Sequence, residues 1–378
     1  MNSPRMPRIA SLDAVRGVAA VIVMIHHMLA ALPEFGTPSG QWVVELLKTW
    51  PLRLIWGGEE AVVVFFVLSG FVLAQPFLMG VHPIWAHFAC RRFLRLYPSY
   101  LAALSLAAIA AIALSSYHLE GMSDHFNGAW NHRISGTEVL RGALFLSDSR
   151  PINTAFWSLV VEMHISLIFP FLFAITLRLG PVAAPVGAAL LGVAVVAYSP
   201  LVASFGETWG MIILLPLKSA YFIFPFVLGI LLAAYRARIG ALLSGPWRDV
   251  RGALCILGLG LLGLDGRLPY ALGAMAVALG ITLVLSVMLS SDWVEQAARV
   301  PALQWLGQVS YSLYLCHATV IHALFYGLHN RLPFGAIMAL IPPVALAVAW
   351  LLWAVVERPS IAWSRRVGMA VVGPARSR

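Results

Sequence analysis

The sequence predicts an all-α protein, a transmembrane bundle of about ten helices with both ends of the chain in the cytoplasm. Three observations predict this fold class. Of the 378 residues, 60% are hydrophobic and 11% are charged, whereas a soluble domain carries about 25% charged residues. Apolar segments near the roughly 20 residues that cross the hydrocarbon recur along the whole chain. Arginines gather in the short segments between them.

The apolar segments give the predicted spans in order. They cover residues 11–32, 60–79, 98–116, 155–177, 181–203, 209–234, 252–268, 271–290, 309–327 and 335–356. The seventh is short because Gly260, Gly263 and Gly266 interrupt it, and it either crosses, re-enters or packs tightly against the eighth. Residues 1–378 are expected to form a single membrane domain, with a core at 8–360 and a basic cytoplasmic tail at 361–378.

The positive charges set the predicted orientation. With the N-terminus inside, 16 Arg and Lys residues fall in inner segments and seven in outer segments, which is the bias that cytoplasmic loops show. The net charge of +9 then belongs to membrane flanks rather than to a nucleic-acid surface. The three cysteines are widely spaced, without CxxC or metal-ligand spacing, so neither a disulfide nor a bound metal is expected.

The longest segment between spans covers residues 117–154, on the predicted outer side. It carries polar and aromatic side chains, among them Asp124, His125 and Trp130. Two interpretations are equally supported: the segment contacts a carbohydrate, or it is a solvated cap over the bundle.

The first span carries charged and polar residues where the membrane makes them costly. A charge near the bilayer centre costs about 2.5 kcal/mol or more, so such a residue is a functional candidate. Arg16 and His27 are 11 positions apart, which puts them on one helix face, ~16 Å apart along the axis. His26 is turned away from that face. His27 is therefore the expected catalytic residue and His26 a packing residue, against the alternative that the histidine only bonds a neighbouring helix.

Other polar residues allow two interpretations each. Ser69-Gly70, in the second span, suits either close helix packing or contact with a ligand. Arg91, Arg92 and Arg95 suit either an ordinary basic flank or a polyphosphate. Lys218, in the sixth span, is an isolated cation that needs a partner.

The fourth span places Ser158 and Glu162 one helical turn apart on one face. Glu162 and His27 both fall in the predicted outer half of the membrane, so a contact between the two is predicted. A carboxylate that pairs with an imidazole fixes its tautomer and raises its basicity. The alternative is a lock between two helices. Near the C-terminus, Ser310, Tyr314 and His317 follow helical spacing on one stripe.

Together these residues form five motifs in a fixed order. The motifs are Leu12-Asp13…Arg16-Gly17 with His27, Phe65-Phe66…Ser69-Gly70-Phe71, Arg92…Arg95-Leu96-Tyr97-Pro98, Trp157-Ser158-Leu159…Glu162, and Ser310-Tyr311-Ser312-Leu313-Tyr314-Leu315…His317 followed by Glu357-Arg358-Pro359. In this order the chain resembles, over residues 8–360, the acyltransferase-3 family of bacterial membrane acyltransferases, such as O-antigen acetylases. Three segments depart from the family pattern: Glu59-Glu60-Ala61, Met163-His164-Ile165 and Cys316. They are expected to line cavities and to alter specificity.

The resemblance implies that an acyl-CoA, acetyl-CoA in particular, donates the acyl group. It implies a catalytic His27 and an essential Arg16, and functional weight on Ser69, Arg92, Arg95, Glu162 and Glu357. The expected acceptor is a hydroxyl of a sugar or glycolipid. The expected location is the bacterial cytoplasmic (inner) membrane, with no nucleic-acid partner.

The expected mechanism follows from these assignments. The CoA phosphates bind Arg91, Arg92, Arg95 and Arg358, and the pantetheine arm passes Arg16 and Ser69. His27 deprotonates the acceptor hydroxyl while Glu162 orients the imidazole. Residues expected to contact the acceptor are Trp157, Ser158, Tyr314, His317 and Glu357. Direct transfer and an acyl-histidine intermediate both remain open. The alternatives are a transporter or flippase, an acyltransferase for a macrolide-type molecule, and a non-catalytic scaffold.

Overall fold

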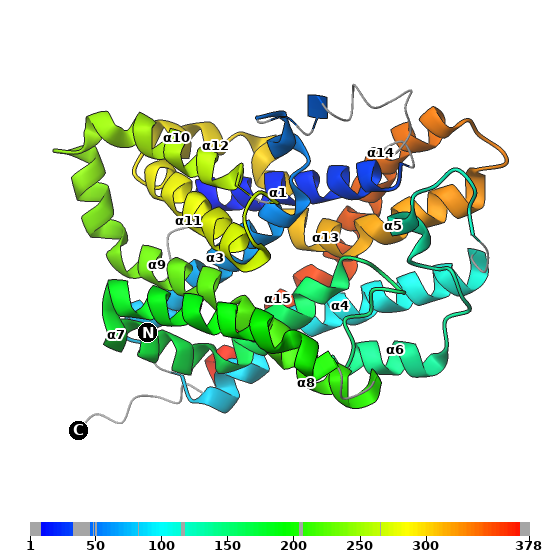
Figure 1. Ribbon diagram of the computed structural model, residues 1–378, viewed down its shortest axis with the longest axis horizontal. Helices are drawn as coiled ribbons and strands as arrows, with labels where there is room; N and C mark the ends of the chain where they lie inside the picture. The colour runs from blue at the N-terminus through cyan, green and yellow to red at the C-terminus, as the bar shows by residue number, and fades with distance from the viewer. Residues whose placement is uncertain are drawn as a thin grey trace.

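The computed structural model describes residues 9–32, 46–47, 49, 51–81, 83–114, 118–203, 207–264 and 266–370. Within these ranges all regular elements are helical (Figure 1). The long helices are α1 (Ala10–Ala30), α3 (Gly58–Leu78), α4 (Trp85–Leu114), α7 (Phe156–Ala203), α8 (Glu207–Tyr221), α9 (Ile223–Ser244), α10 (Arg251–Leu262), α11 (Tyr270–Met288), α13 (Pro301–Leu328) and α14 (Phe334–Leu352). The other α-helices are α5 (Asp124–Asn127), α6 (Gly136–Ala143), α12 (Asp292–Ala298) and α15 (Arg358–Ala370).

Seven helical stretches among the described residues are long and apolar enough to cross a membrane. One of them, within α7, holds both the fourth and the fifth predicted spans, because α7 continues through a non-helical Gly180 (φ 80°). Compared with the roughly 20 residues that cross the hydrocarbon, helix α13 is longer, with 28 residues, and α8 and α10 are shorter, with 15 and 12. The predicted all-helical, multi-pass membrane architecture is therefore confirmed, and the number of ten spans and the orientation stay predictions.

Several predicted span limits are wrong in detail. Helix α4 begins at Trp85 rather than at residue 98, so Arg91, Arg92 and Arg95 lie on the helix and not in a loop before it. Arginine is a good helix former, and apolar runs alone do not detect such a polar first part. The sixth predicted span is two helices, α8 and α9, which meet at Phe222.

The seventh predicted span corresponds to the short helix α10, which packs tightly against α11. Gly258 and Gly280 allow this approach, because a Cβ on Gly258 would lie 2.8 Å from the carbonyl oxygen of Gly280. The interpretation of residues 252–268 as a segment packed against its neighbour agrees with this contact.

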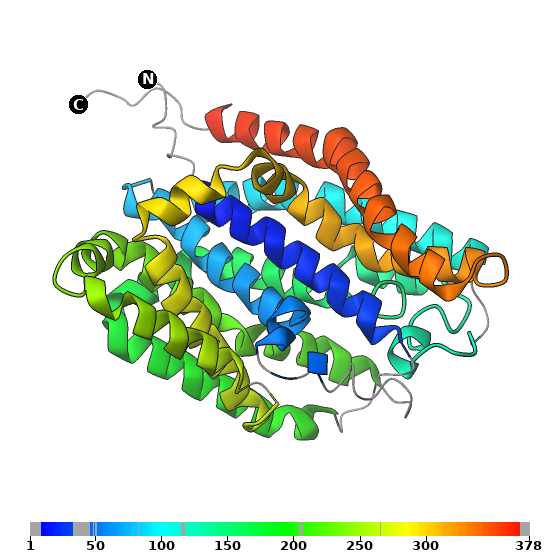
Figure 2. The same cartoon turned by 90° about the horizontal axis from the view of Figure 1, so that it is seen from above.

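Two further glycine contacts position the helices that carry the polar motifs. Helices α1 and α13 cross where a Cβ on Gly17 would lie 2.7 Å from the backbone nitrogen of Gly307. Helices α3 and α9 cross where a Cβ on Gly70 would lie 2.9 Å from the Cα of Phe226. Figure 2 shows α1 running through the middle of the bundle, with α3 on one side and α13 on the other. Small residues at such crossings bring backbones close together, as is common in membrane bundles.

Residues 361–370 of the basic tail predicted at 361–378 belong to helix α15. A π-helical turn at Trp353–Glu357 joins α14 to α15, and α15 packs along α4. The hydroxyl of Ser364 donates a hydrogen bond to the carbonyl oxygen of Arg91 (2.8 Å), and His87 Nε2 lies 3.3 Å from the carbonyl oxygen of Val367. Residues 371–378 lie outside the described ranges.

Candidate active site

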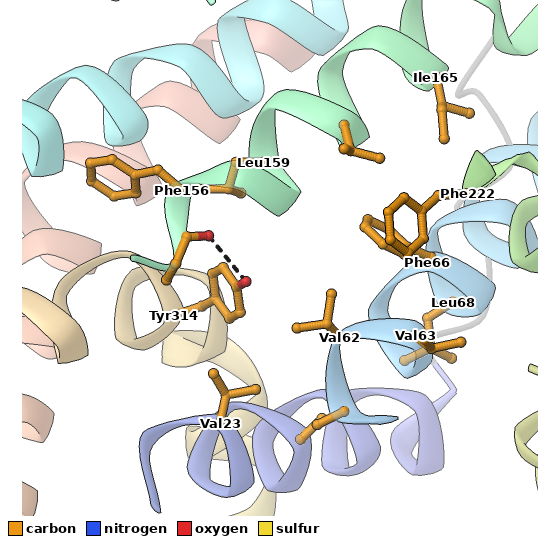
Figure 3. Close-up of a cluster of buried hydrophobic side chains, with 14 of the residues drawn as sticks. Val23, Val62, Val63, Phe66, Leu68, Phe156, Leu159, Ile165, Phe222 and Tyr314 are labelled. Carbon is orange, nitrogen blue, oxygen red and sulfur yellow. Dashed lines mark hydrogen bonds between the residues drawn. The ribbon is translucent and has the colours of Figure 1, made fainter. Parts of the chain in front are cut away.

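The bundle contains two neighbouring cavities that share part of their lining. The histidine cavity, of about 730 Å³, is lined by His26 and His27 among others, and the arginine cavity, of about 350 Å³, by Arg16 and the arginines of α4. Val62 and Tyr314 line both cavities. Figure 3 shows these two side chains between Val23, which lines the histidine cavity, and Leu159, which lines the arginine cavity. We call the Val62–Tyr314 pair the partition.

The partition carries a hydrogen-bond network at its centre. The hydroxyls of Tyr314 and Ser158 are 2.5 Å apart, and both lie within reach of the carbonyl oxygen of Ala155, at 3.2 Å from Tyr314 and 3.3 Å from Ser158. Either hydroxyl satisfies the carbonyl oxygen, so the other is free to donate elsewhere. Ser158 lines only the arginine cavity.

His27 lies in a group of aromatic nitrogen rings on the histidine cavity. Its ring centroid is 5.1 Å from His317, 5.4 Å from His26 and 5.6 Å from His125. Among the described residues, nothing forms a hydrogen bond with the His27 ring. His26, in contrast, is held by the carbonyl oxygen of Trp56 at 3.0 Å from Nδ1 and stacks on the Trp56 ring. Of the two adjacent histidines, His27 is thus the one whose nitrogens are available to a ligand.

The histidines beside His27 differ in their surroundings. His317 is fully buried behind His27, donates from Nδ1 to the carbonyl oxygen of Leu313 (3.1 Å), and has no partner at Nε2. His317 does not line the cavity. His125, on α5, lines it, and its pKa is lowered first by burial and then by electrostatic interaction with His26 and Arg150. The lowered pKa favours a neutral His125 ring.

Glu162 lies in the arginine cavity, so the predicted contact of Glu162 with His27 is wrong. Its carboxylate accepts hydrogen bonds from the guanidinium of Arg92 and from the hydroxyl of Ser69 (2.9 Å). Arg92 Nε also donates to the hydroxyl of Ser166 (3.0 Å). The prediction matched the depths of the two residues in the membrane, but depth does not fix the direction in which each helix face points.

The arginine cavity has an excess of positive charge. Of its described lining residues, five are arginines and two are glutamates: Arg16, Arg91, Arg92, Arg95, Arg365, Glu162 and Glu357. Glu357 is buried and accepts a hydrogen bond from the hydroxyl of Ser312 (2.6 Å). Arg16 and Arg95 are half-buried, and neither forms a hydrogen bond or ion pair with a described residue. A cavity in which guanidinium groups outnumber carboxylates is typical of a site for phosphate.

The predicted site residues divide between the cavities. Residues on the histidine cavity are His27, Trp157 and Tyr314, and those on the arginine cavity are Arg16, Ser69, Arg91, Arg92, Arg95, Ser158, Glu162, Tyr314 and Glu357. Ser158 and Glu357, expected on the acceptor side, thus face the arginines. Arg358 lines neither cavity; its guanidinium lies 5.7 Å from the Trp353 ring. The π-helical turn just before Arg358 shifts the faces of the residues that follow, and Arg365 reaches the cavity instead.

Sequence reasoning missed several residues of the histidine cavity. Arg150 lines it and lies 5.7 Å from the Trp157 ring, and Lys218 lines it 3.8 Å from the carboxylate of Asp148, which supplies the partner that the sequence left open. The sequence marked Lys218 as a cation in need of a partner but did not identify Asp148, because the loop and α8 meet only in the fold. Trp130 is fully buried and donates to the carbonyl oxygen of Ile152 (2.7 Å), so it belongs to a packed cap.

The three departures from the family pattern have different positions. Glu59 and Glu60 line the histidine cavity, and the buried Glu60 accepts a hydrogen bond from Arg53 Nε (3.0 Å). His164 bonds to the hydroxyl of Ser219 (2.9 Å) and Cys316 packs toward α14, and neither lines the histidine cavity or the arginine cavity. Among the described residues, no three His, Cys, Asp or Glu side chains are grouped as a metal site would require.

Comparisons with known proteins show the family to which the chain belongs. Residues 9–355 match the family model described as an acyltransferase domain, so the chain belongs to the acyltransferase-3 family. It is similar to the acyltransferase MdmB of Streptomyces mycarofaciens, with 28% identity over 391 residues that cover 94% of this chain and 92% of that protein. No solved structure matches the chain. The protein is therefore an acyl-transferring enzyme of the membrane.

Proposed function

We propose that the protein transfers an acyl group, acetyl in particular, from acyl-CoA in the arginine cavity to a hydroxyl of a sugar-containing acceptor in the histidine cavity. One observation carries this proposal: the two cavities differ in chemistry and share Val62 and Tyr314 in their lining. A thioester that reaches the partition from the arginine side meets the hydroxyl of an acceptor bound on the other side.

The arginine cavity suits the donor. The phosphates of CoA carry several negative charges, and the cavity offers five arginines against two glutamates. In this proposal the cavity faces the cytoplasm, where acyl-CoA is made, and the enzyme lies in the bacterial inner membrane. Arg92 is fixed by Glu162 and Ser166, so its guanidinium is held in position before the donor binds. A fixed group loses less conformational entropy on binding.

His27 is the proposed general base. Its unpartnered imidazole accepts the proton of the acceptor hydroxyl as the oxygen attacks the thioester carbonyl carbon. The new C–O bond forms, the C–S bond breaks, and the departing thiolate takes the proton back from His27. His317 Nε2, buried without a partner 5.1 Å between ring centroids from His27, is a hydrogen-bond acceptor available to the protonated form. An acyl-histidine intermediate would use the same ring as nucleophile.

Tyr314 is the proposed donor to the carbonyl oxygen. Negative charge grows on this oxygen in the transition state, and a fixed O–H group lowers the barrier most when it points there. Ser158 is able to take over the hydrogen bond to the carbonyl oxygen of Ala155 (3.3 Å). The Tyr314 hydroxyl is then able to donate a hydrogen bond to the thioester carbonyl oxygen, and it gives up only its hydrogen bond with Ser158.

One feature of the histidine cavity favours a second kind of acceptor. Many of its lining side chains are apolar or aromatic, including Phe222, Tyr270 and Val277. An acceptor with an apolar body, such as a macrolide-type molecule, suits this lining. A sugar hydroxyl on either kind of molecule meets His27 in the same way.

The proposal is tested by mass spectrometry of lipids, glycans and small molecules from cells with wild-type protein, without it, and with His27→Ala or His26→Ala. We expect one acyl-modified product that His27→Ala abolishes and that His26→Ala only reduces. If His27→Ala inserts normally in the membrane and still yields the full amount of product, the proposed chemistry is wrong.

A further inference from the structure

The C-terminal helix α15 contributes an arginine to the arginine cavity. Arg365 lines the cavity, is exposed, and has no hydrogen-bond or ion-pair partner among the residues that the structure describes. Helix α15 (Arg358–Ala370) lies beyond residues 9–355, which match the family. Family membership therefore does not account for Arg365, and its role is a question about this chain.

A hydrogen bond to the backbone of Arg91 places Arg365 close to that residue. The neighbouring residue, Ser364, is buried and donates to the carbonyl oxygen of Arg91 (2.8 Å). One turn of helix α15 beyond it, the contact of His87 with the carbonyl oxygen of Val367 (3.3 Å) supports the same packing of α15 on α4 (Figure 1). The two arginines thus start from adjacent points on two packed helices, and both line the same cavity.

The arginines of the cavity form two layers by exposure. Arg16, Arg92 and Arg95 are half-buried, whereas Arg91 and Arg365 are exposed. A long donor that enters with its thioester leading leaves its nucleotide end at the exposed layer. The group at that end with the highest charge is the 3′-phosphate of the ribose, a phosphate monoester with about −1.5 to −2 charges at pH 7. Two guanidinium groups match a phosphate of this charge.

We propose that Arg365, together with Arg91, binds the 3′-phosphate of acyl-CoA, so that α15 selects donors that carry this phosphate. This inference rests on the proposed function, because it assumes that the donor binds in the arginine cavity. The C-terminal helix thus has a role in donor selection. Without the charge of Arg365, the enzyme should lose its preference for donors that carry the 3′-phosphate.

The test compares two donors and two variants of the full chain in phosphatidylcholine nanodiscs. The donors are radiolabelled acetyl-CoA and acetyl-dephospho-CoA, which lacks only the 3′-phosphate. The variants are Arg365→Gln and the matched control Arg366→Gln, which removes the same charge from the next position, also exposed, that does not line the cavity. The measured quantity is the Kd of each donor, with thermal unfolding as a check on folding.

For acetyl-CoA, Arg365→Gln is expected to raise the Kd about tenfold, equivalent to about 1.4 kcal/mol. For acetyl-dephospho-CoA, wild type and Arg365→Gln are expected to bind equally, and Arg366→Gln is expected to match wild type with both donors. An equal loss for both donors overturns the assignment to the 3′-phosphate. Equal effects of Arg365→Gln and Arg366→Gln overturn the role of Arg365. If wild type binds neither donor, the proposed function itself fails.

Discussion

Removing the hydroxyl of Tyr314 separates its structural role from its proposed chemical role. In Tyr314→Phe the ring still fills the partition, and only the bonds to Ser158 (2.5 Å) and to the carbonyl oxygen of Ala155 (3.2 Å) are lost. Ser158 keeps its own contact with that carbonyl oxygen at 3.3 Å, so no buried group loses its last partner. The loss of stability should therefore be about 1 kcal/mol, the net value of an ordinary hydrogen bond.

The expected catalytic effect is far larger. Removing one donor that stabilises a developing oxyanion lowers the rate about 100- to 1,000-fold. The assay follows transfer of radiolabel from saturating acetyl-CoA into the extractable lipids and glycans of membranes, and donor Kd is measured in parallel. We expect the rate to fall by this factor while the Kd changes less than threefold, as an order-of-magnitude limit.

The matched control is Tyr311→Phe. Tyr311 lies on the same helix, lines the arginine cavity and donates one hydrogen bond, to the carbonyl oxygen of Leu96 (3.0 Å), but it does not line the histidine cavity. Its loss should cost a similar amount of stability with little change in rate. A Tyr314→Phe enzyme that keeps its rate within threefold of wild type, or a Tyr311→Phe enzyme that loses as much, would refute the role of Tyr314 at the partition.

Three further predictions follow from other contacts. Glu162→Gln should weaken acetyl-CoA binding about tenfold, or about 1.4 kcal/mol, because Arg92 loses its charged partner. The midpoint of the pH dependence of transfer should stay the same. A shifted midpoint would show that Glu162 acts on His27 and would contradict its assignment to Arg92. Gly70→Ala should lower the melting temperature, by overpacking worth about 1–3 kcal/mol, since its Cβ would lie 2.9 Å from Phe226, whereas Gly240→Ala, with nothing within 4 Å, should not. Burial raises the pKa of Glu295, but hydrogen bonds from Ala10 and Ser11 outweigh this effect and hold the pKa below 4.5. The ionised Glu295 therefore stabilises the fold at pH values above 4.5. This stabilisation is lost as the pH falls through the lowered pKa. Melting curves of wild type and Glu295→Gln should differ near neutral pH and converge in acid; a constant difference would contradict this.

The sequence predicts well which segments form membrane helices and which polar residues within them are candidates for the site, because polar groups are costly in hydrocarbon. Arg16 and His27 lie on one helix, and each lines one of the two neighbouring cavities, Arg16 the arginine cavity and His27 the histidine cavity. The start of α4 at Trp85 was missed, since an arginine-bearing first part is helical without being apolar.

Contacts between helices were much harder to predict. Glu162 and His27 were predicted to lie at the same depth in the membrane, but the carboxylate of Glu162 contacts Arg92 and Ser69 instead. A single sequence gives positions along each helix and relative angles within it, whereas the rotation of one helix against another depends on packing such as the Gly17–Gly307 crossing. For the same reason Arg365, on a short helix after a π-helical turn, gave no signal.

The central claim is that donor and acceptor approach Tyr314 and Val62 from opposite cavities. A cryo-electron microscopy map of the His27→Ala enzyme with bound acetyl-CoA would test it most directly. The prediction is nucleotide density among the arginines of α4 and α15, and the thioester carbon beside the Tyr314 hydroxyl, with the histidine cavity left for the acceptor. Density for the nucleotide in the histidine cavity, or a thioester that ends away from Tyr314, would contradict it.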